Sequence, residues 1–373
     1  MHHDKIVKKF LEYFGKHKHK LLPDRSLIPP EHDPSSLFVN SGMQPLKPYF
    51  LGLKTPPAKR LCNIQKCVRT IDIEDVGNKK TLTFFYMLGS WSIGDYWKDV
   101  AIPLAWDLLT KGLKLDPNRL YFTIFKGDRK VPYDKESERV ILDLGISKKK
   151  IFALNAEENF WRAGPTGPCG PCVEVHYDRG KRFGCKNCKP DCDKCNRWIE
   201  IWNVAVCMEY NCDAKGRLTP LPFKSIDTGA GLERVAALLQ NKDSVYETTL
   251  FSPILRKLEQ LSGKKYSSNI KAMRIVLDHL RACCFIVNEG IVPDKIERGY
   301  VLRRLLRRMI IYGRELGLEE KHYLELAKIV KKLYSEIKLK KFEKVFVEEF
   351  RKFNQTLTKG LNRLRRMICN KRK

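Results

Sequence analysis

Residues 223–239 place a carboxylate and an arginine on either side of a glycine-rich bend. The alternation that leads to Asp227 predicts a short strand, and the apolar spacing from Leu232 onward predicts a helix. Residues 228–231 would form the hinge between them. Arg234 would then lie in the first turn of the helix, where its guanidinium and the free N–H groups can face a polyphosphate. Asp227 could hold an ammonium group. The alternative is an ordinary strand, turn and helix with a solvated arginine.

A second arginine stands at the mouth of a predicted hairpin. Residues 65–69 are predicted as a strand that ends in Arg69, residues 70–80 as a polar loop, and residues 82–88 as a strand of high β propensity. In-line attack on an α-phosphate builds negative charge, and a planar guanidinium can bind two of the oxygens at once. The hairpin therefore predicts phosphate chemistry at Arg69.

Four cysteines lie in a lysine-rich polar stretch with the spacing Cys-x2-Cys-x3-Cys-x2-Cys. Four thiolates at such a spacing can close a tetrahedral zinc site, and reduced thiols without a metal are the alternative. These cysteines are Cys185, Cys188, Cys192 and Cys195. Cys169 and Cys172 form a weaker pair that suits the wall of a binding site better than a metal. The glycine and proline density across 164–171 argues against regular structure there.

The composition indicates a globular protein that attracts polyanions. The chain carries 71 Lys and Arg against 43 Asp and Glu, a formal charge of +28, so nucleic acid is the expected partner unless the charge reflects a generally basic proteome. No apolar run reaches the roughly 20 residues that a membrane helix needs. The N-terminus has no apolar signal region, so we expect a cytoplasmic protein without a membrane segment.

The predicted elements change in character near residue 245. Strand signals end there, and a helical region follows. Within the predicted helix 300–317, two arginine pairs repeat at four-residue spacing opposite a leucine face. Such a stripe could track a phosphate backbone, or it could be a solvated basic face. The predicted helices are 4–20, 99–112, 247–262, 270–289, 300–317 and 320–366, and residues 134–150 are predicted as a helix and a basic turn. The remaining predicted strands are 37–39, 121–125 and 200–211.

Several stretches, in order along the chain, resemble the motifs of alanine-specific class II aminoacyl-tRNA synthetases. Asp-Thr-Gly-Ala-Gly-Leu-Glu-Arg is similar to the third class II motif, Leu-Phe-Val-Asn-Ser-Gly-Met to the first, and the hairpin to the second. The resemblance covers roughly residues 5–317. The matching stretches are 37–53, 65–96, 159–176, 200–211, 227–234, 274–284 and 298–308. Lys80, Thr81 and Tyr86 stand where that family usually has arginine, histidine and glutamate.

The resemblance implies an α+β fold, in which an antiparallel class II sheet flanked by helices is followed by an all-α domain. The catalytic domain would span 1–245 with a cysteine-rich insert at 181–197. Residues 246–373 would form a helical domain, with a basic C-terminal tail, that binds the acceptor stem of tRNA(Ala). The implied reaction joins alanine to ATP as alanyl-adenylate, with Mg²⁺ beside the phosphates, and transfers alanine to tRNA. A paralogue that loads another acceptor, and a tRNA-binding copy without catalysis, are the alternatives.

The resemblance also implies the residues of each site. The catalytic set is Arg69, Arg234 and Asp227. The ATP set is Arg69, Lys80, Phe84, Met87, Glu200 and Arg234. The alanine set is Met43, Trp161, Asn203, Asp227 and Gly229. The tRNA set is Lys295, Arg298, Arg303, Arg304, Arg307 and Arg308.

An editing domain with histidine and cysteine metal ligands usually follows the helical part in this family. The stretch from Lys321 onward contains one histidine and one cysteine. Excluding serine, or the smaller glycine, from an alanine site yields only about 10–200-fold discrimination. We therefore expect mischarging that a separate editing protein corrects.

Overall fold

The computed structural model describes residues 1–23, 26–31, 33, 35–190, 192 and 194–370, with the backbone alone at 361 and 363–370. The chain forms two compact units. Unit 1 comprises Met1–Cys67 and Phe85–Lys242, and unit 2 comprises Val68–Phe84 and Asp243–Lys373. The division near residue 242 lies close to the expected boundary at 245. Unit 2 differs from the expected helical domain because it also contains the loop of the predicted hairpin.

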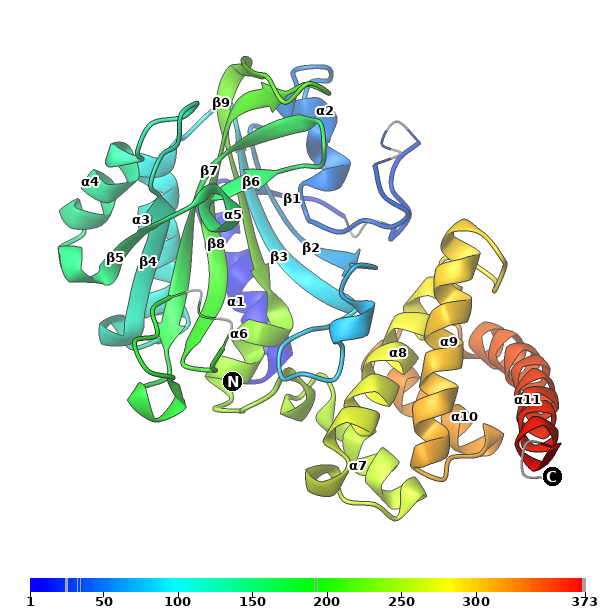
Figure 1. Cartoon of the computed structure of the whole chain (residues 1–373). Coiled ribbons are helices and arrows are strands. Elements are labelled where there is room, and N and C mark those ends of the chain that lie inside the picture. The colour runs from blue at the N-terminus through cyan, green and yellow to red at the C-terminus, as the bar shows by residue number, and fades with distance from the viewer. Residues whose placement is uncertain (24–25, 32, 34, 191, 193, 371–373) are drawn as a thin grey trace. The chain divides into compact units, whose positions relative to one another are not determined.

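The sheet contains nine strands within the described residues, and its order is β1-β2-β3-β9-β8-β7-β4-β5 with β6 paired to β7 (Figure 1). The pairs from β3 through β9, β8 and β7 to β4 are antiparallel, as is β6–β7, whereas β1–β2 and β4–β5 are parallel. The strands are β1 Lys20–Leu21, β2 Arg60–Val68, β3 Phe84–Ile93, β4 Leu120–Phe125, β5 Ile151–Leu154, β6 Phe160–Arg162, β7 Gly167–Asp178, β8 Trp198–Cys212 and β9 Leu218–Gly231. The mixed α and β architecture with a mainly antiparallel sheet confirms the expected fold class.

Two glycine-rich segments predicted as irregular are strands. The proposed hinge at 228–231 is the end of β9, where Gly229 pairs with Gly89 of β3. The segment 164–171 enters β7 at Gly167. A Cβ on Gly170 would lie 1.8 Å from the carbonyl oxygen of Cys207, so the passing strand β8 requires glycine there. Both predictions were wrong because glycine inside a paired strand can mark a close approach of backbones.

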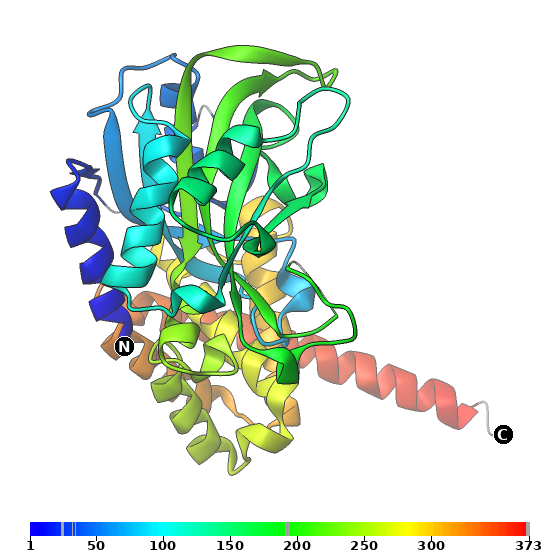
Figure 2. The same ribbon diagram turned by 90° about the vertical axis from the view of Figure 1, so that its left-hand side faces the viewer.

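The helices of unit 1 agree with the sequence in position more than in length. The predicted helix 4–20 ends at Lys16. Within 134–150, predicted as a helix and a basic turn, the α-helix ends at Asp143 and a 3-10 turn of three lysines follows at Lys148–Lys150. Helix 99–112 is present, but its last turn, Leu108–Gly112, is a π-helix. The predicted strand 37–39 is irregular. The α-helices are α1 His3–Lys16, α2 Lys47–Phe50, α3 Lys98–Asp107, α4 Lys135–Asp143, α5 Ala156–Asn159 and α6 Leu232–Leu239, with α3 and α4 side by side (Figure 2).

Unit 2 is built around α8, whose residues 272–287 are all buried. Helix α9 packs along α8, and α11 packs against α8, α9 and α10. The predicted helix 320–366 is two helices, separated at residues 334–338. The helices are α7 Ser252–Ser262, α8 Ile270–Asn288, α9 Glu297–Glu315, α10 Glu320–Leu333 and α11 Leu339–Asn370. Among the described residues, no helix combines the length and apolar character needed to cross a bilayer.

Candidate active site

Five strands of the sheet place one row of residues side by side. Each member lies directly opposite the next across an antiparallel pair, so all share one face of the sheet. Asp227 lies two residues before Gly229 on β9 and therefore points to that same face. The row runs Thr123, Glu174, Asn203, Gly229 and Gly89. Three residues of the expected alanine set, Asn203, Asp227 and Gly229, are thus brought together.

Asp227 is a buried carboxylate with a fixed hydrogen-bond partner. Trp91, directly opposite on β3, donates its indole N–H to Asp227 Oδ1 at 2.7 Å. Burial raises the pKa of Asp227 to about 7, although the hydrogen bonds from Trp91 and the Thr228 backbone work in the other direction. A cation placed beside this carboxylate would favour its ionised form. The environment therefore suits a ligand that carries an ammonium group.

The space beside Gly229 is limited by a methionine. A Cβ on Gly229 would lie 2.9 Å from Met87 Sδ, and the same sulfur accepts the N–H of Gly42 at 3.1 Å. Met87 was expected at ATP, but in the structure it contacts a glycine of the alanine set. Met43 and Trp91 belong to one buried apolar cluster, against which Trp161 packs. These apolar residues lie on the same side of the sheet as Trp91, the hydrogen-bond partner of Asp227.

Arg234 and Glu200 form an ion pair. Arg234 lies in the first turn of α6, as the sequence predicted, and its Nη1 donates to Glu200 Oε2 at 2.7 Å. Their side chains are 33% and 38% exposed, so solvent and ligands can reach both groups. The carboxylate therefore orients the guanidinium and keeps it accessible.

The other residues of the expected ATP set, Arg69, Lys80 and Phe84, belong to unit 2. Phe84 is buried, and its ring stacks on Phe285 with the centroids 4.1 Å apart. The guanidinium of Arg281 also lies over the Phe84 ring at 4.8 Å. The ring is therefore part of the core of unit 2, whereas Lys80 is exposed.

The loop between Arg69 and Phe84 is held within unit 2 by contacts from α8 and from the segment that precedes α7. Asp278 Oδ1 accepts the N–H of Thr83 at 2.8 Å, and Arg274 Nη1 donates to the carbonyl of Gly77 at 3.1 Å. Tyr246 donates its hydroxyl to the carbonyl of Thr81 at 2.8 Å. The second half of the loop is thus fixed to helical residues of unit 2.

The arginine stripe of α9 divides into two pairs, and each pair binds one acid. Glu349 of α11 is buried and lies 3.8 Å from Arg303 Nε and 2.7 Å from Arg307 Nε. Glu74, in the loop that follows Arg69, lies 2.5 Å from Arg304 Nη2 and 3.7 Å from Arg308 Nε. Three further side chains complete a hollow of about 350 Å³ over the stripe: Tyr300, Ile311 and Phe353.

A buried histidine fixes one arginine of the second pair. His279 Nδ1 lies 2.8 Å from Asp278 Oδ2, and its Nε2 lies 3.1 Å from Arg308 Nη1. Because an arginine only donates, Nε2 must accept, and the ring proton is then on Nδ1, facing Asp278. Asp278, His279 and Arg308 therefore form a chain of hydrogen bonds from the hairpin loop to α9. Lys295, just before α9, is exposed, and Arg298, in the first turn of α9, is half-buried.

Comparison with known proteins decides the family. The family model described as tRNA synthetases class II (A) matches residues 5–373. The chain belongs to this class II tRNA synthetase family. Proteins named alanine–tRNA ligase from Dehalococcoides mccartyi and Natranaerobius thermophilus are 42% and 44% identical over 98% and 99% of this chain. One from Borreliella afzelii is 42% identical over 96% of it. The chain spans 42%, 42% and 62% of the lengths of these three relatives.

At one position where the chain departs from the resembled motif, the structure shows a backbone contact. Tyr86 stands in place of the usual glutamate, and its N–H lies 3.2 Å from both carboxylate oxygens of Glu233. Glu233 is buried in α6. This carboxylate therefore ties β3 to the helix that carries Arg234.

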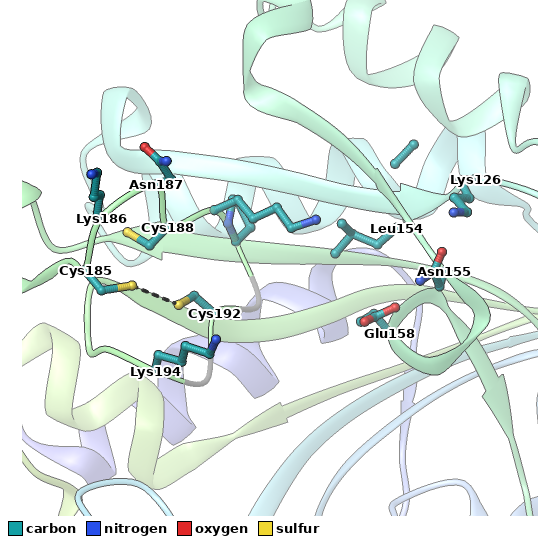
Figure 3. Close-up of a pocket in the computed structure, with 13 residues that line it drawn as sticks. Lys126, Leu154, Asn155, Glu158, Cys185, Lys186, Asn187, Cys188, Cys192 and Lys194 are labelled. Atoms are coloured by element: carbon teal, nitrogen blue, oxygen red, sulfur yellow. Dashed lines mark hydrogen bonds between the residues drawn. The ribbon is translucent and has the colours of Figure 1, made fainter.

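The structure brings three of the four candidate zinc ligands together. Cys185 Sγ and Cys192 Sγ are 3.5 Å apart (Figure 3). Cys195 Sγ is 3.7 Å from Cys192 Sγ. Two thiolates on one tetrahedral zinc, each at about 2.3 Å, would be about 3.8 Å apart, so the spacing fits this metal. Cys188 lies outside this group of three and contacts Arg197 Nη1 at 3.9 Å.

The surroundings of the cysteines favour a thiolate at one position. Burial would raise the pKa of Cys195, but hydrogen bonds from the backbone of Arg197 and Cys185 and from the neighbouring thiols outweigh it and lower the pKa to about 7. A hydrogen bond with Cys192 raises the pKa of Cys185 to about 12. The loop lines a hollow of about 410 Å³ together with Lys126, Asn155 and Glu158 (Figure 3).

Glu174, which lies next to Asn203 in the row, had no predicted role. Its carboxylate contacts His176 Nε2 at 3.1 Å and Thr123 Oγ1 at 3.4 Å. Both Glu174 and His176 lie within the family-like segment 159–176. The alternation Val-Glu-Val-His was the available signal, since it predicts a strand with one polar face. The strand that lies opposite could not be read from it.

Proposed function

We propose that this chain activates alanine with ATP and transfers the alanyl group to the 3′ end of tRNA(Ala) in the cytoplasm. The observation that supports it most is the common face of Asn203, Asp227 and Gly229. A buried carboxylate there can hold an ammonium, and Met87, whose sulfur would lie 2.9 Å from a Cβ on Gly229, would limit the size of the substrate side chain. The relatives, whose chains extend beyond the matched part, are named alanine–tRNA ligase, which agrees with this proposal.

In the first step, Asp227 binds the ammonium of alanine, and Trp161 and Met43 line the side-chain site. A carboxylate oxygen of alanine forms a bond to the α-phosphorus of ATP, and the bond to pyrophosphate breaks. Arg234, oriented by Glu200, and Arg69 stabilise the charge that develops on the phosphate oxygens. Mg²⁺, when bound near Glu200, would neutralise charge on the pyrophosphate.

In the second step, a terminal ribose hydroxyl of tRNA attacks the carbonyl carbon of the adenylate, and AMP leaves. We assign catalysis to residues 1–245 and acceptor-stem binding to residues 246–373. Lys295, Arg298 and the four arginines of α9 would contact the RNA. Arg304 is 40% exposed and Arg308 is 13% exposed, so Arg304 is the better placed of the Glu74 pair to meet a phosphate.

Zinc is proposed as a structural ion of the cysteine loop. Cys185, Cys192 and Cys195 would be three of its ligands because their sulfur atoms lie within 4.8 Å of one another. Cys188 would complete the set by a local movement of its loop. Bound zinc would fix the loop by cross-linking its two ends.

Alanine-dependent exchange of pyrophosphate into ATP tests the first step, and charging of a tRNA(Ala) transcript tests the second. Arg234→Ala should lower exchange by about a hundredfold or more if Arg234 stabilises developing charge. Arg217→Ala is the control, since Arg217 is exposed and pairs with Asp213 in the turn that precedes β9. Exchange without charging would indicate the paralogue with another acceptor. Absence of alanine-dependent exchange in the wild type would contradict the proposal and favour a non-catalytic copy.

A further inference from the structure

Glu174 carries a carboxylate that the proposed reaction does not use. Its side chain is 13% exposed and lies in the middle of the sheet, directly opposite Asn203. Asn203 Nδ2 donates to Glu174 Oε1 at 3.4 Å. On the other oxygen, Oε2, the carboxylate meets His176 Nε2 and Thr123 Oγ1. Side chains from three strands thus converge on one acid.

The neighbours of Glu174 are arranged as donors. Thr123 Oγ1 accepts the amide of Asn159 at 3.1 Å, which leaves its hydroxyl hydrogen to donate to Glu174. The same amide donates to the carbonyl of Cys172 at 2.9 Å and is therefore fixed itself. An ionised carboxylate only accepts, so with Glu174 charged the tautomer of His176 that carries its proton on Nε2 donates to it. The hydroxyl of Thr123, the amide of Asn203 and this imidazole can then all donate to the carboxylate.

This arrangement decides which way the amide of Asn203 turns. The oxygen and nitrogen of a carboxamide are distinguished by their partners, and a carboxylate selects the NH₂ group. Asn203 Oδ1 must then point away from Glu174. Within the described residues this oxygen is buried and has no hydrogen-bond partner. A buried acceptor without a partner is unfavourable unless a ligand supplies the donor.

We propose that Glu174 is a positioning residue for alanine recognition: it fixes the amide of Asn203 so that Oδ1 faces the ammonium of the substrate held by Asp227. The inference rests on the proposed function. An ammonium has three N–H donors, and Asp227 and Asn203 supply acceptors for two of them. Asn203 lies opposite Gly229, and Asp227, two residues before Gly229 on β9, lies opposite Val206 beyond a register shift in β8. A ligand placed over Gly229 would therefore have both side chains beside it. The reversed amide would present its NH₂ group to the ammonium and weaken binding.

The first test is Glu174→Gln, which keeps the size of the side chain and removes its charge. A glutamine can donate as well as accept, so it no longer selects one orientation of Asn203. In alanine-dependent pyrophosphate exchange, we expect KM for alanine to rise about tenfold or more, the loss typical of a hydrogen bond to a charged group, and KM for ATP to stay within about twofold. An unchanged KM for alanine in the folded variant overturns the inference.

A double-mutant cycle separates positioning from direct contact. If Glu174 acts through Asn203, then Glu174→Gln should have little effect on KM for alanine once Asn203→Ala is present. If the two effects multiply, Glu174 acts on the substrate independently and the inference fails. Neither a general loss of stability nor a purely structural role would produce the non-additive pattern in KM for alanine alone.

Two further variants keep the test sound. Glu209→Gln makes the same change elsewhere in the sheet, where Glu209 lies 3.7 Å from Lys224, and should leave both KM values unchanged. Glu174→Asp retains the charge, so its KM for alanine should remain below that of Glu174→Gln, and a value as high as that of Glu174→Gln contradicts electrostatic positioning. A wild-type protein without alanine-dependent exchange refutes the proposed function. If the wild-type protein shows exchange and Glu174→Gln leaves KM for alanine unchanged, this inference alone is refuted.

Discussion

The buried charge of Asp227 lowers the stability of the folded protein, and the same charge can bind a cation. The ordinary pKa of an aspartate is 3.8, and burial raises that of Asp227 to about 7. Between these values the folded state binds more protons than the unfolded state, so the free energy of unfolding falls as the pH rises from about 4 to 7. Above pH 7 the group contributes a constant destabilisation of up to ~4 kcal/mol. A bound ammonium recovers part of it.

Asp227→Asn should therefore stabilise the ligand-free protein, and increasingly so with pH. An asparagine oxygen can still accept the Trp91 N–H, but it carries no buried charge. The melting temperature of the variant should exceed that of the wild type by more at pH 8 than at pH 5, while alanine-dependent exchange is lost. An equal difference at both pH values would show that the carboxylate is not the titrating group.

Gly89 is a second position where one added carbon atom should change the stability of the protein. A Cβ there would lie 2.4 Å from Cζ2 and 2.5 Å from Cη2 of Trp91. Trp91 is fully buried and donates to Asp227, so the ring cannot move without breaking that bond. Gly89→Ala should lower the free energy of unfolding by about 1–3 kcal/mol and raise KM for alanine. Gly15→Ala in α1 is the control, since no atom lies within 4 Å of the added Cβ. Equal melting temperatures for the two variants would contradict this account.

At the scale of elements, α9 is held by acids at two places. Glu349→Gln should lower the melting temperature, because it leaves the guanidinium groups of Arg303 and Arg307 together without their buried partner. RNA binding should not weaken, since the two arginines gain freedom to meet phosphates. Glu348→Gln is the matched control: this neighbour is 60% exposed and pairs only with Lys352 among the contacts described. A loss of RNA affinity without a loss of stability would mean that Glu349 takes part directly in RNA binding.

The cysteine loop, residues 185–195, is the other element for which we predict a bound partner, a zinc ion. Purified protein should contain about one equivalent of zinc, and Cys192→Ser should lose it, because Cys192 lies within 4 Å of both Cys185 and Cys195. Cys188→Ser should retain more metal than Cys192→Ser, because three thiols remain clustered. Metal-free wild-type protein with an unchanged melting temperature would favour reduced thiols.

The sequence predicted elements well where their pattern is local. Helices α8 and α9 follow from apolar periodicity, and β4 from a run of β-branched and aromatic residues. It failed at 228–231 and 167–171, where glycines pair with another strand and the cause lies far away in the chain. The same limit applies to the site. Asp227, Asn203 and Gly229 were proposed from the sequence pattern and the resemblance, whereas the place of Glu174 depends on strand register, which no local pattern reveals.

At the scale of the whole molecule, the charge of +28 predicts how RNA binds. Each phosphate contact releases counterions, so the logarithm of the association constant for a tRNA acceptor stem should fall linearly and steeply with the logarithm of salt concentration. Glu74→Gln removes an acid that competes with phosphate for Arg304 and Arg308, and it should tighten binding. A flat salt dependence would argue against phosphate contacts as the main source of affinity.

The row from Thr123 to Gly89 also bears on how the protein folds. Its members come from β4, β7, β8, β9 and β3, so the row exists only after strands more than a hundred residues apart have paired in one register. A slip of one residue in any of them would turn its side chain to the opposite face. No fragment of the sheet can therefore recognise the substrate. Alanine bound at this row should slow amide hydrogen exchange across all five strands together, because every opening that breaks the register also releases the ligand.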